Sequence, residues 1–316
     1  MSNTLLMLAI LPGILIIIYV YRMDKVEKEP WRLIFKLMVF GALSCIPASV
    51  MEMAIDSAMP AYPEGSLSYA VTMAFCSAAF CEELCKFAFL RFGTWKNPEF
   101  GYRFDGIVYG VAVAVGFAVL ENIMYVGQYG LYTGIVRAVM AVPLHAFCGV
   151  FMGIFYGAAK QARIQGKGAG KFLLLALIVP MMIHGVYDTL AFLGNTAASV
   201  VLLAFVVLMY IVSIRYIRRF SRDDWKAGFY PDTQPLSAGQ DQGGHQQPLS
   251  GRGGSGSAAS QRRQAAAGYR AYPGQVQDGK IVLLCPHCGC GLRVPVGMGR
   301  IRVRCPHCGR EFSQDT

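Results

Sequence analysis

Seven apolar runs, each long enough to cross a lipid bilayer, constrain the fold of this chain more than any other feature. A transmembrane helix needs about 20 consecutive, mostly apolar residues. The runs are Thr4–Tyr21, Leu33–Ile55, Tyr69–Phe92, Asp105–Val126, Ile135–Ala159, Phe172–Leu193 and Ala197–Tyr216. Only 15% of the 316 residues are charged, and 54% are hydrophobic. The sequence therefore predicts an all-α polytopic membrane protein with about seven transmembrane helices.

The segments that connect these runs alternate in charge. Lys and Arg follow the first, third, fifth and seventh runs, whereas the second, fourth and sixth connections carry neither residue. Basic connections stay on the cytosolic side of a membrane. We expect the N-terminus outside, the C-terminal tail in the cytosol, and a multi-pass protein in the lipid bilayer of the plasma membrane. The first run has no basic residues before it and no small-residue cleavage site, so we expect a retained helix.

The composition changes after the seventh run, which predicts three parts. Residues 1–220 would form the transmembrane domain. Residues 221–278 are rich in Gly, Ser and Gln, a composition typical of a disordered linker, which here would lie in the cytosol. Folding would resume in residues 279–316 as a small β module, with strands near 281–284, 292–294 and 301–304.

Two Cys-Pro-His-Cys-Gly elements in this last part predict a zinc site. They supply Cys285, Cys288, Cys305 and Cys308, and sixteen residues separate the two pairs. Four thiolates at this spacing suit one tetrahedral structural Zn²⁺ ion. A disulfide is disfavoured in the reducing cytosol. The module resembles the zinc-ribbon family, whose members usually bind a partner, and its arginines suit a protein or a nucleic acid.

Ionisable side chains interrupt four of the apolar runs. They are Glu82, Glu83 and Lys86 in the third run, Glu121 in the fourth, His145 in the fifth, and His184 and Asp188 in the sixth. A charge near the bilayer centre costs about 2.5–3.5 kcal/mol on insertion scales. Such residues are functional by default, and those on separate helices would lie at compatible depths. A catalytic or transport site is therefore predicted.

The spacing of these residues predicts which of them lie on the same helix face. Glu82 and Lys86 are four residues apart, so the lysine can neutralise a carboxylate. His184 and Asp188 have the same separation, which suits a carboxylate that orients an imidazole. Glu82 and Glu83 point about 100° apart on a helix. We therefore expect the two glutamates to have different roles. Arg137, in the outer part of the fifth run, has several possible acidic partners, Glu121 among them.

Four motifs, in order along separate runs, carry a resemblance to a known family. They are E-E-x-x-K at 82–86, F-x-x-x-E-N at 117–122, Pro-Leu-His at 143–145 and H-x-x-x-D at 184–188. Together they resemble the PrsW family of intramembrane proteases, which is related to the prenyl endopeptidases and bacteriocin-processing enzymes. The resemblance implies cleavage of a single-span membrane protein, such as an anti-sigma factor in stress signalling. It implies that Glu82, Glu83, His184 and His145 are catalytic, and that Glu121 and Asp188 support them.

Amide hydrolysis needs an activated water, a donor for the oxyanion and an acid for the leaving amine. We expect one of Glu82 and Glu83 to activate water and the other to pair with Lys86. His184 would polarise the carbonyl, with His145 as the second imidazole. Two histidines and a carboxylate also suit a catalytic metal, but the chain has no H-E-x-x-H motif, so the metal-free mechanism is preferred.

Two other functions use the same residues. A proton-linked transporter would employ the Glu, His and Asp side chains as a relay, although no inverted repeat is visible in the sequence. A non-enzymatic membrane anchor that displays the zinc ribbon would need the cysteines and not the membrane carboxylates.

Overall fold

The computed structural model describes residues 3–26, 28–224, 280–287, 291–295, 297–304 and 310–315. The chain divides into two compact units, Met1–Tyr230 and Pro231–Thr316. The predicted linker at 221–278 lies outside the described residues except at its start, because helix α8 continues to Asp223.

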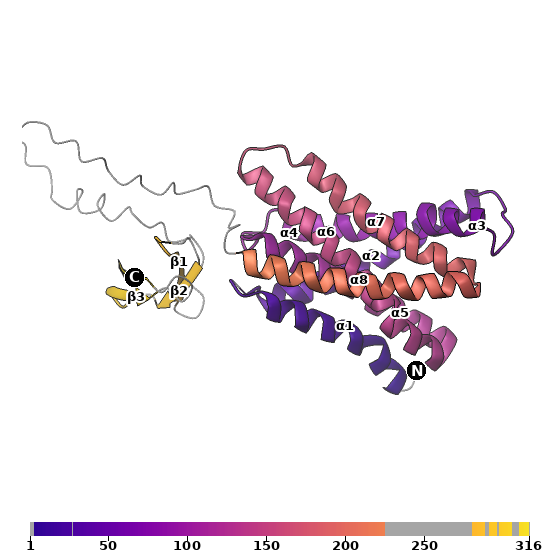
Figure 1. The fold of residues 1–316 in the computed structure, drawn as a ribbon, viewed down its shortest axis with the longest axis horizontal. Coiled ribbons are helices and arrows are strands. Elements are labelled where there is room, and N and C mark those ends of the chain that lie inside the picture. Colours follow the sequence, from indigo (N-terminus) through magenta and orange to yellow (C-terminus); the bar gives the residue numbers. More distant parts are fainter. Residues whose placement is uncertain are drawn as a thin grey trace, which may run out of the picture. The chain divides into compact units, whose positions relative to one another are not determined.

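The first unit is a bundle of helices (Figure 1). They are α1 (Asn3–Met23), α2 (Trp31–Ala58), α3 (Leu67–Thr72), the π-helix η1 (Met73–Ala79), α4 (Phe80–Thr94), α5 (Arg103–Val139), α6 (Ala141–Ile164), α7 (Gly170–Leu193) and α8 (Thr196–Asp223). Five helical stretches of the described chain are long and apolar enough to cross a membrane. These are Asn3–Met23, Trp31–Ala58, Arg103–Ile164, Gly170–Leu193 and Thr196–Asp223. The chain is a multi-pass membrane protein.

The five stretches differ from the seven predicted runs at two places. The third run is divided among α3, η1 and α4, and its charged residues lower its hydropathy. The fourth and fifth runs fall within the single stretch Arg103–Ile164. That stretch is interrupted at Gly130, whose φ of 79° and ψ of −159° are not helical. Only glycine adopts such a conformation readily, so the chain changes direction there.

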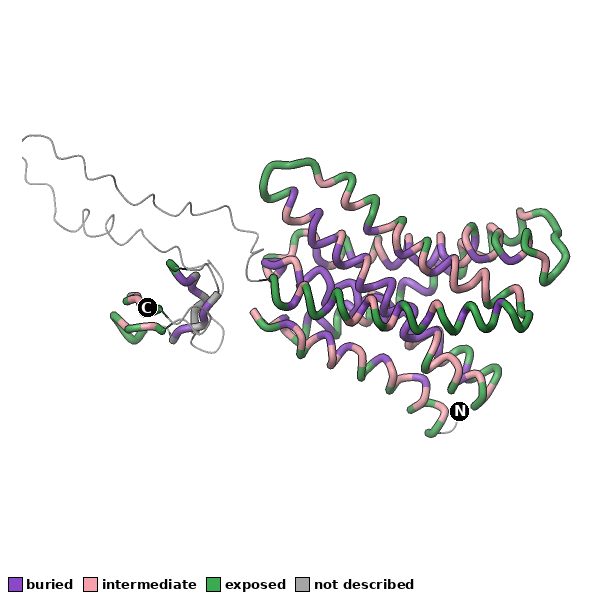
Figure 2. Tube along the Cα trace, viewed as in Figure 1, coloured by how far each residue is buried: buried purple, intermediate pink, exposed green. Residues whose placement is uncertain are grey.

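Helices α5 and α6 form the centre of the bundle, and Figure 2 shows the buried residues concentrated there. Glycines on both helices allow the backbones to meet. A Cβ atom added to Gly106 would lie 2.6 Å from the carbonyl oxygen of Gly153, and one added to Gly149 would lie 2.7 Å from that of Gly110. Small residues promote such close helix packing in membranes. The glycine spacing on α6 therefore brings α5 against the face that carries His145.

Replacing Gly106 with alanine tests this packing. Its Cβ would meet backbone atoms of Gly153 and Gly157, which cannot rotate away. We expect a loss of about 1–3 kcal/mol in the free energy of unfolding, the usual cost of overpacking. Unfolding in mixed detergent micelles measures it. The matched control is Gly127→Ala on the same helix, because the space around Gly127 is open. Equal stability of the two variants would contradict the close packing.

The end of α8 is tied to two other helices at the side of the bundle that the charge pattern predicts to be cytosolic. The backbone N–H of Phe104 donates to Oδ1 of Asp224 at 2.9 Å, so this carboxylate caps the start of α5. The hydroxyl of Ser221 donates to the carbonyl oxygen of Met23 at the end of α1. Burial raises the pKa of Asp224 to about 7. The bundle therefore holds its last helix by polar contacts as well as by apolar packing.

The second unit contains two antiparallel hairpins. Strand β1 (Lys280–Leu284) pairs with β2 (Gly291–Pro295), and β3 (Arg300–Arg304) pairs with β4 (Glu311–Asp315). Three of these strands match the predicted ones, whereas β4 was not predicted. Cys285 is buried after β1, but Cys288, Cys305 and Cys308 lie outside the described residues. The zinc ribbon therefore stays a prediction.

Acidic residues stand opposite most of the arginines on β3. Arg300 faces Asp315 and Arg304 faces Glu311, while Arg302 faces Ser313. Residues directly opposite each other on one sheet face lie close enough to interact, as the register allows for Arg304 and Glu311. The partner of the basic row stays a prediction.

Candidate active site

Helix α4 presents Glu82, Glu83 and Lys86 to the interior of the bundle. Glu83 and Lys86 are fully buried, and Glu82 is 7% exposed. Nζ of Lys86 donates to Oε2 of Glu82 and to Oε1 of Glu83, both at 2.9 Å. The expectation that only one glutamate pairs with Lys86 is therefore wrong. The cause is that positions three and four residues before Lys86 both lie one turn away from it.

A π-helix leads directly into this turn. Segment η1 ends at Ala79, three residues before Glu82. Single π-turns inside α-helices often occur at functional sites, because they rotate the residues that follow. The ring of Phe75 in η1 packs against Gly185 of α7, where a Cβ atom would overlap it. Because residue 185 is a glycine, η1, the segment that leads into α4, can pack closely against α7 beside His184.

Lys86 uses all three of its donor hydrogens. Its third contact is with Nδ1 of His145 on α6, at 3.0 Å. The ammonium group also lies 3.9 Å from the centroid of the Phe117 ring on α5, a cation–π contact. Lysine thus connects both glutamates to a histidine from another helix.

His184 on α7 lies between two carboxylates. Nδ1 is 2.9 Å from Oε1 of Glu83, and Nε2 is 3.1 Å from Oδ2 of Asp188. Ionised carboxylates only accept hydrogen bonds. Both ring nitrogens therefore donate, which is the pattern of a positively charged imidazolium. The predicted pairing of His184 with Asp188 is present in the structure.

His145 has a different environment and a different protonation pattern. Nδ1 faces Lys86, which has no acceptor, and Nε2 lies 2.8 Å from Oε2 of Glu121. A lysine ammonium only donates and a carboxylate only accepts. His145 is therefore the neutral tautomer with its hydrogen on Nε2, and the lone pair of Nδ1 points at the centre of the site. The two imidazole rings are 5.1 Å apart and perpendicular.

The partner of Arg137 was open in the sequence. Nη2 of Arg137 forms an ion pair with Oε2 of Glu121 at 2.7 Å, and Nε donates to Oδ1 of Asn122 at 3.1 Å. The guanidinium also lies 3.9 Å from the centroid of the Tyr125 ring. The positive charge of Arg137 is therefore used inside the bundle.

The four residues predicted to be catalytic meet in space. One side-chain atom from each of Glu82, Glu83, His145 and His184 lies within 4.8 Å of the corresponding atoms of the others. The supporting residues Lys86, Glu121 and Asp188 all contact members of this group. We call these seven residues the polar centre. They come from α4, α5, α6 and α7.

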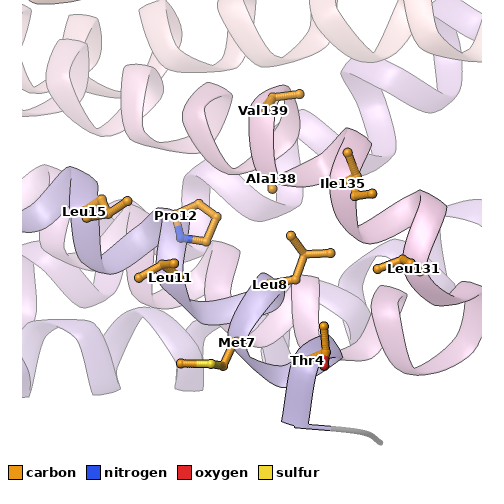
Figure 3. Close-up of a pocket in the computed structure, with 10 residues that line it drawn as sticks. All are labelled: Thr4, Met7, Leu8, Leu11, Pro12, Leu15, Leu131, Ile135, Ala138 and Val139. Atoms are coloured by element: carbon orange, nitrogen blue, oxygen red, sulfur yellow. The ribbon is translucent and has the colours of Figure 1, made fainter.

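A hollow of about 540 Å³ lies elsewhere, between α1 and the end of α5 (Figure 3). Its walls are aliphatic apart from Thr4. It contains no member of the polar centre, so it offers no group for hydrolysis.

The polar centre and Arg137 together carry an excess of negative charge. Four carboxylates stand against the fixed positive charges of Lys86 and Arg137. A protonated His184 reduces the excess from two charges to one. A divalent cation, with both histidines neutral, would cancel it. Charge balance matters here because an uncompensated charge is costly inside a membrane protein.

The donors present fit such a cation. Each imidazole directs Nδ1 inward and has a carboxylate at Nε2, which is the usual outer partner of a metal-binding histidine. Two histidines and a glutamate form a common catalytic zinc set. In this structure the ammonium of Lys86 lies among the same donors, so it would have to move aside.

Comparison with known proteins identifies the family of this chain. Residues 29–215 match the model of the PrsW family intramembrane metalloprotease. Protease PrsW of Oceanobacillus iheyensis is 32% identical over 216 residues, which cover 68% of this chain and 95% of the relative. Protease PrsW of Geobacillus kaustophilus is 34% identical over 187 residues, with 59% and 79% covered. No solved structure matches the chain. The chain belongs to the PrsW family of intramembrane proteases.

Proposed function

We propose that the polar centre hydrolyses a peptide bond of a single-span membrane protein, with Glu82 as the general base. The observation that carries this proposal is the meeting of two glutamates and two histidines from three helices in a buried site. Family membership establishes a protease, and the positions of these side chains support their roles in it.

Exposure and bonding distinguish the two glutamates. Glu83 is fully buried, and its Oε1 already contacts both Lys86 and His184. Glu82 retains some exposure, and its Oε2 accepts a hydrogen bond from Lys86 while both histidines stay 3.9–4.0 Å away. A water molecule can therefore approach Glu82 more easily than Glu83. Glu82 is assigned as the base, and Glu83 as the residue that holds Lys86 and His184 in place.

The reaction follows from these positions. The Glu82 carboxylate takes a proton from water while the water oxygen forms a bond to the scissile carbonyl carbon. In the absence of a metal, the positive charge of His184 would stabilise the oxyanion that develops. The proton on Glu82 then passes to the amide nitrogen as the C–N bond breaks, releasing an amine and a carboxylic acid. Each step uses a group within the cluster.

A divalent metal is also part of the proposal. His145, His184 and Glu83 would hold it, which leaves Glu82 free as the base. When bound, the ion would supply Lewis-acid polarisation of the scissile carbonyl. The metal-free mechanism preferred from the sequence leaves one negative charge in the centre without a counter-ion, and this disfavours it.

Metal content tests this assignment. We expect the full chain carrying Cys285→Ser, which disrupts the predicted ribbon site, to retain about one equivalent of divalent metal. Adding His184→Asn should remove it, because one of three ligands is lost. Elemental analysis of the purified protein measures both. The control is His245→Asn, which alters a histidine outside the membrane unit. A metal-free protein that still cleaves its substrate would contradict the metal site.

Cleavage itself is tested by co-expression. Single-span reporters tagged at both ends, including one with the transmembrane segment of an anti-sigma factor, are expressed with the wild-type chain or with His184→Ala. We expect a shortened membrane fragment only with the wild type. Reconstituted protein that moves protons across liposomes and cleaves none of the reporters would instead favour the transporter.

The topology is proposed as seven spans with the N-terminus outside and the tail in the cytosol of the plasma membrane. The alternating basic connections and the change of direction at Gly130 support this count. The residues that follow α8, up to residue 278, would then act as a cytosolic linker. Residues 279–316 would form a zinc ribbon through Cys285, Cys288, Cys305 and Cys308, and would recruit a protein or a nucleic acid.

A further inference from the structure

Arg137 reaches the polar centre only because the chain reverses before it. It follows Glu121 by sixteen residues, which would separate the two by about 24 Å on a straight helix. Their side chains instead form an ion pair at 2.7 Å. The left-handed conformation at Gly130 makes the reversal, so residues 131–139 run back along the first part of α5.

The ion pair between Arg137 and Glu121 lies next to His145. The same oxygen, Oε2 of Glu121, lies 2.7 Å from Nη2 of Arg137 and 2.8 Å from Nε2 of His145. Arg137 therefore holds the acceptor to which the imidazole donates. Among the described contacts, Arg137 reaches the polar centre through Glu121. Any effect of Arg137 on the reaction must therefore pass through Glu121.

A second contact fixes the direction of the guanidinium. Nε of Arg137 donates to Oδ1 of Asn122, and Nδ2 of Asn122 donates to the carbonyl oxygen of Ala9 on α1 at 3.1 Å. Asn122 is fully buried. The next residues after Arg137, Ala138 and Val139, line the hollow beside α1 (Figure 3). Helix α1 thus supports Arg137 through the hydrogen bond that it accepts from Asn122.

We infer that Arg137 is a positioning residue of the protease: by holding Glu121 against Nε2 of His145, it keeps the imidazole oriented with the lone pair of Nδ1 directed at the reaction centre. Without Arg137, Glu121 loses its fixed position, and the hydrogen bond that it accepts from Nε2 of His145 weakens. The inference rests on the proposed role of His145, but its first test requires no cleavage.

The first test is ¹⁵N solid-state NMR of the full chain in lipid bilayers, with ring-labelled histidine. The chain has five histidines, and His145→Asn assigns the signal of interest. We expect wild type and Arg137→Lys to show the Nε2–H form at His145. Arg137→Gln should shift the Nε2–H signal, because the hydrogen bond from Nε2 to Glu121 weakens. Arg91→Gln is the matched control, because Arg91 also stacks on an aromatic ring, at 4.9 Å, yet lies outside the polar centre. An unchanged His145 signal in Arg137→Gln overturns the inference.

The second test uses a reporter that the wild type cleaves. Loss of an outer partner of an active-site histidine typically lowers activity about 10–100-fold. We expect a decrease of this size in kcat for Arg137→Gln, with KM within about threefold of wild type and substantial rescue by Arg137→Lys.

A double-mutant cycle with Glu121 distinguishes the positioning role of Arg137 from a general effect on the stability of the protein. Arg137→Gln should have less than about a twofold effect in a Glu121→Gln background, because the residue through which it acts is already altered. A full additional decrease there overturns the inference. If Arg137→Gln does not accumulate in membranes, the same cycle with Arg137→Met, which also lacks the charge, decides. Failure of the wild type to cleave any reporter would contradict the proposed function and leave the NMR result valid.

Discussion

Glutamine in place of Glu82 lowers the rate of substrate cleavage by about 10²–10⁴-fold, the contribution of a general base. The amide has nearly the same shape as the carboxylate but cannot take a proton from water. Glu82 has one close partner, Lys86, so the helices should remain in place. The measurement is single-turnover cleavage of a reporter by purified protein in liposomes, with unfolding in detergent as the check on structure.

The matched control for this variant is Glu52→Gln. Glu52 also lies in a membrane helix, α2. Among the described residues, it forms no hydrogen bond or ion pair with the polar centre. It should retain wild-type cleavage within about twofold. Glu83→Gln is expected to lose activity and stability together, because Glu83 contacts Lys86 and His184. A Glu82→Gln protein with full activity would exclude Glu82 as the base.

Methionine in place of Lys86 removes about 3–5 kcal/mol from the free energy of unfolding, as expected when one partner of a buried ion pair is deleted. Two neighbouring carboxylates then lose their common counter-ion, and Nδ1 of His145 loses its donor. Methionine matches the length of the lysine stem, so the loss reports on charge more than on packing. Thermal or mixed-micelle unfolding measures the change, and cleavage should be abolished.

A compensating variant distinguishes charge from shape. The triple variant Lys86→Met, Glu82→Gln, Glu83→Gln removes the cation together with both anions. We expect it to recover most of the lost stability, because replacing all members of a buried ion cluster is often neutral or stabilising. It should remain inactive. A triple variant as unstable as Lys86→Met would show that lysine acts by packing.

Contacts within one helix were predictable from the sequence, because helix geometry fixes them. Glu82 with Lys86, and His184 with Asp188, follow from a separation of four residues, and both contacts are present. Lys86 also forms an ion pair with Glu83, three residues before it. This second pair was not predicted, because only one of the two glutamates was expected to pair with the lysine. On a helix, positions three and four residues apart are both close enough for such a pair.

Contacts between helices were not predictable to the same degree. Depth along each span showed only that His145 and His184 could lie near the glutamates. Which ring nitrogen faces which partner depends on helix rotation, and this is set by packing such as that of Gly185 on Phe75. The partner of Arg137 depended on the reversal at Gly130, and a glycine among several in that loop gave no specific signal.

The pairing inside α4 has a consequence for how this protein enters the membrane. Both ion pairs of Lys86 are formed with residues of its own helix, so they can exist before any other helix is present. The insertion machinery would then meet a segment with one net negative charge instead of three separate ions, which lowers the transfer cost. The helix that carries the glutamates brings its own counter-ion into the lipid, and the histidines can join it later during assembly.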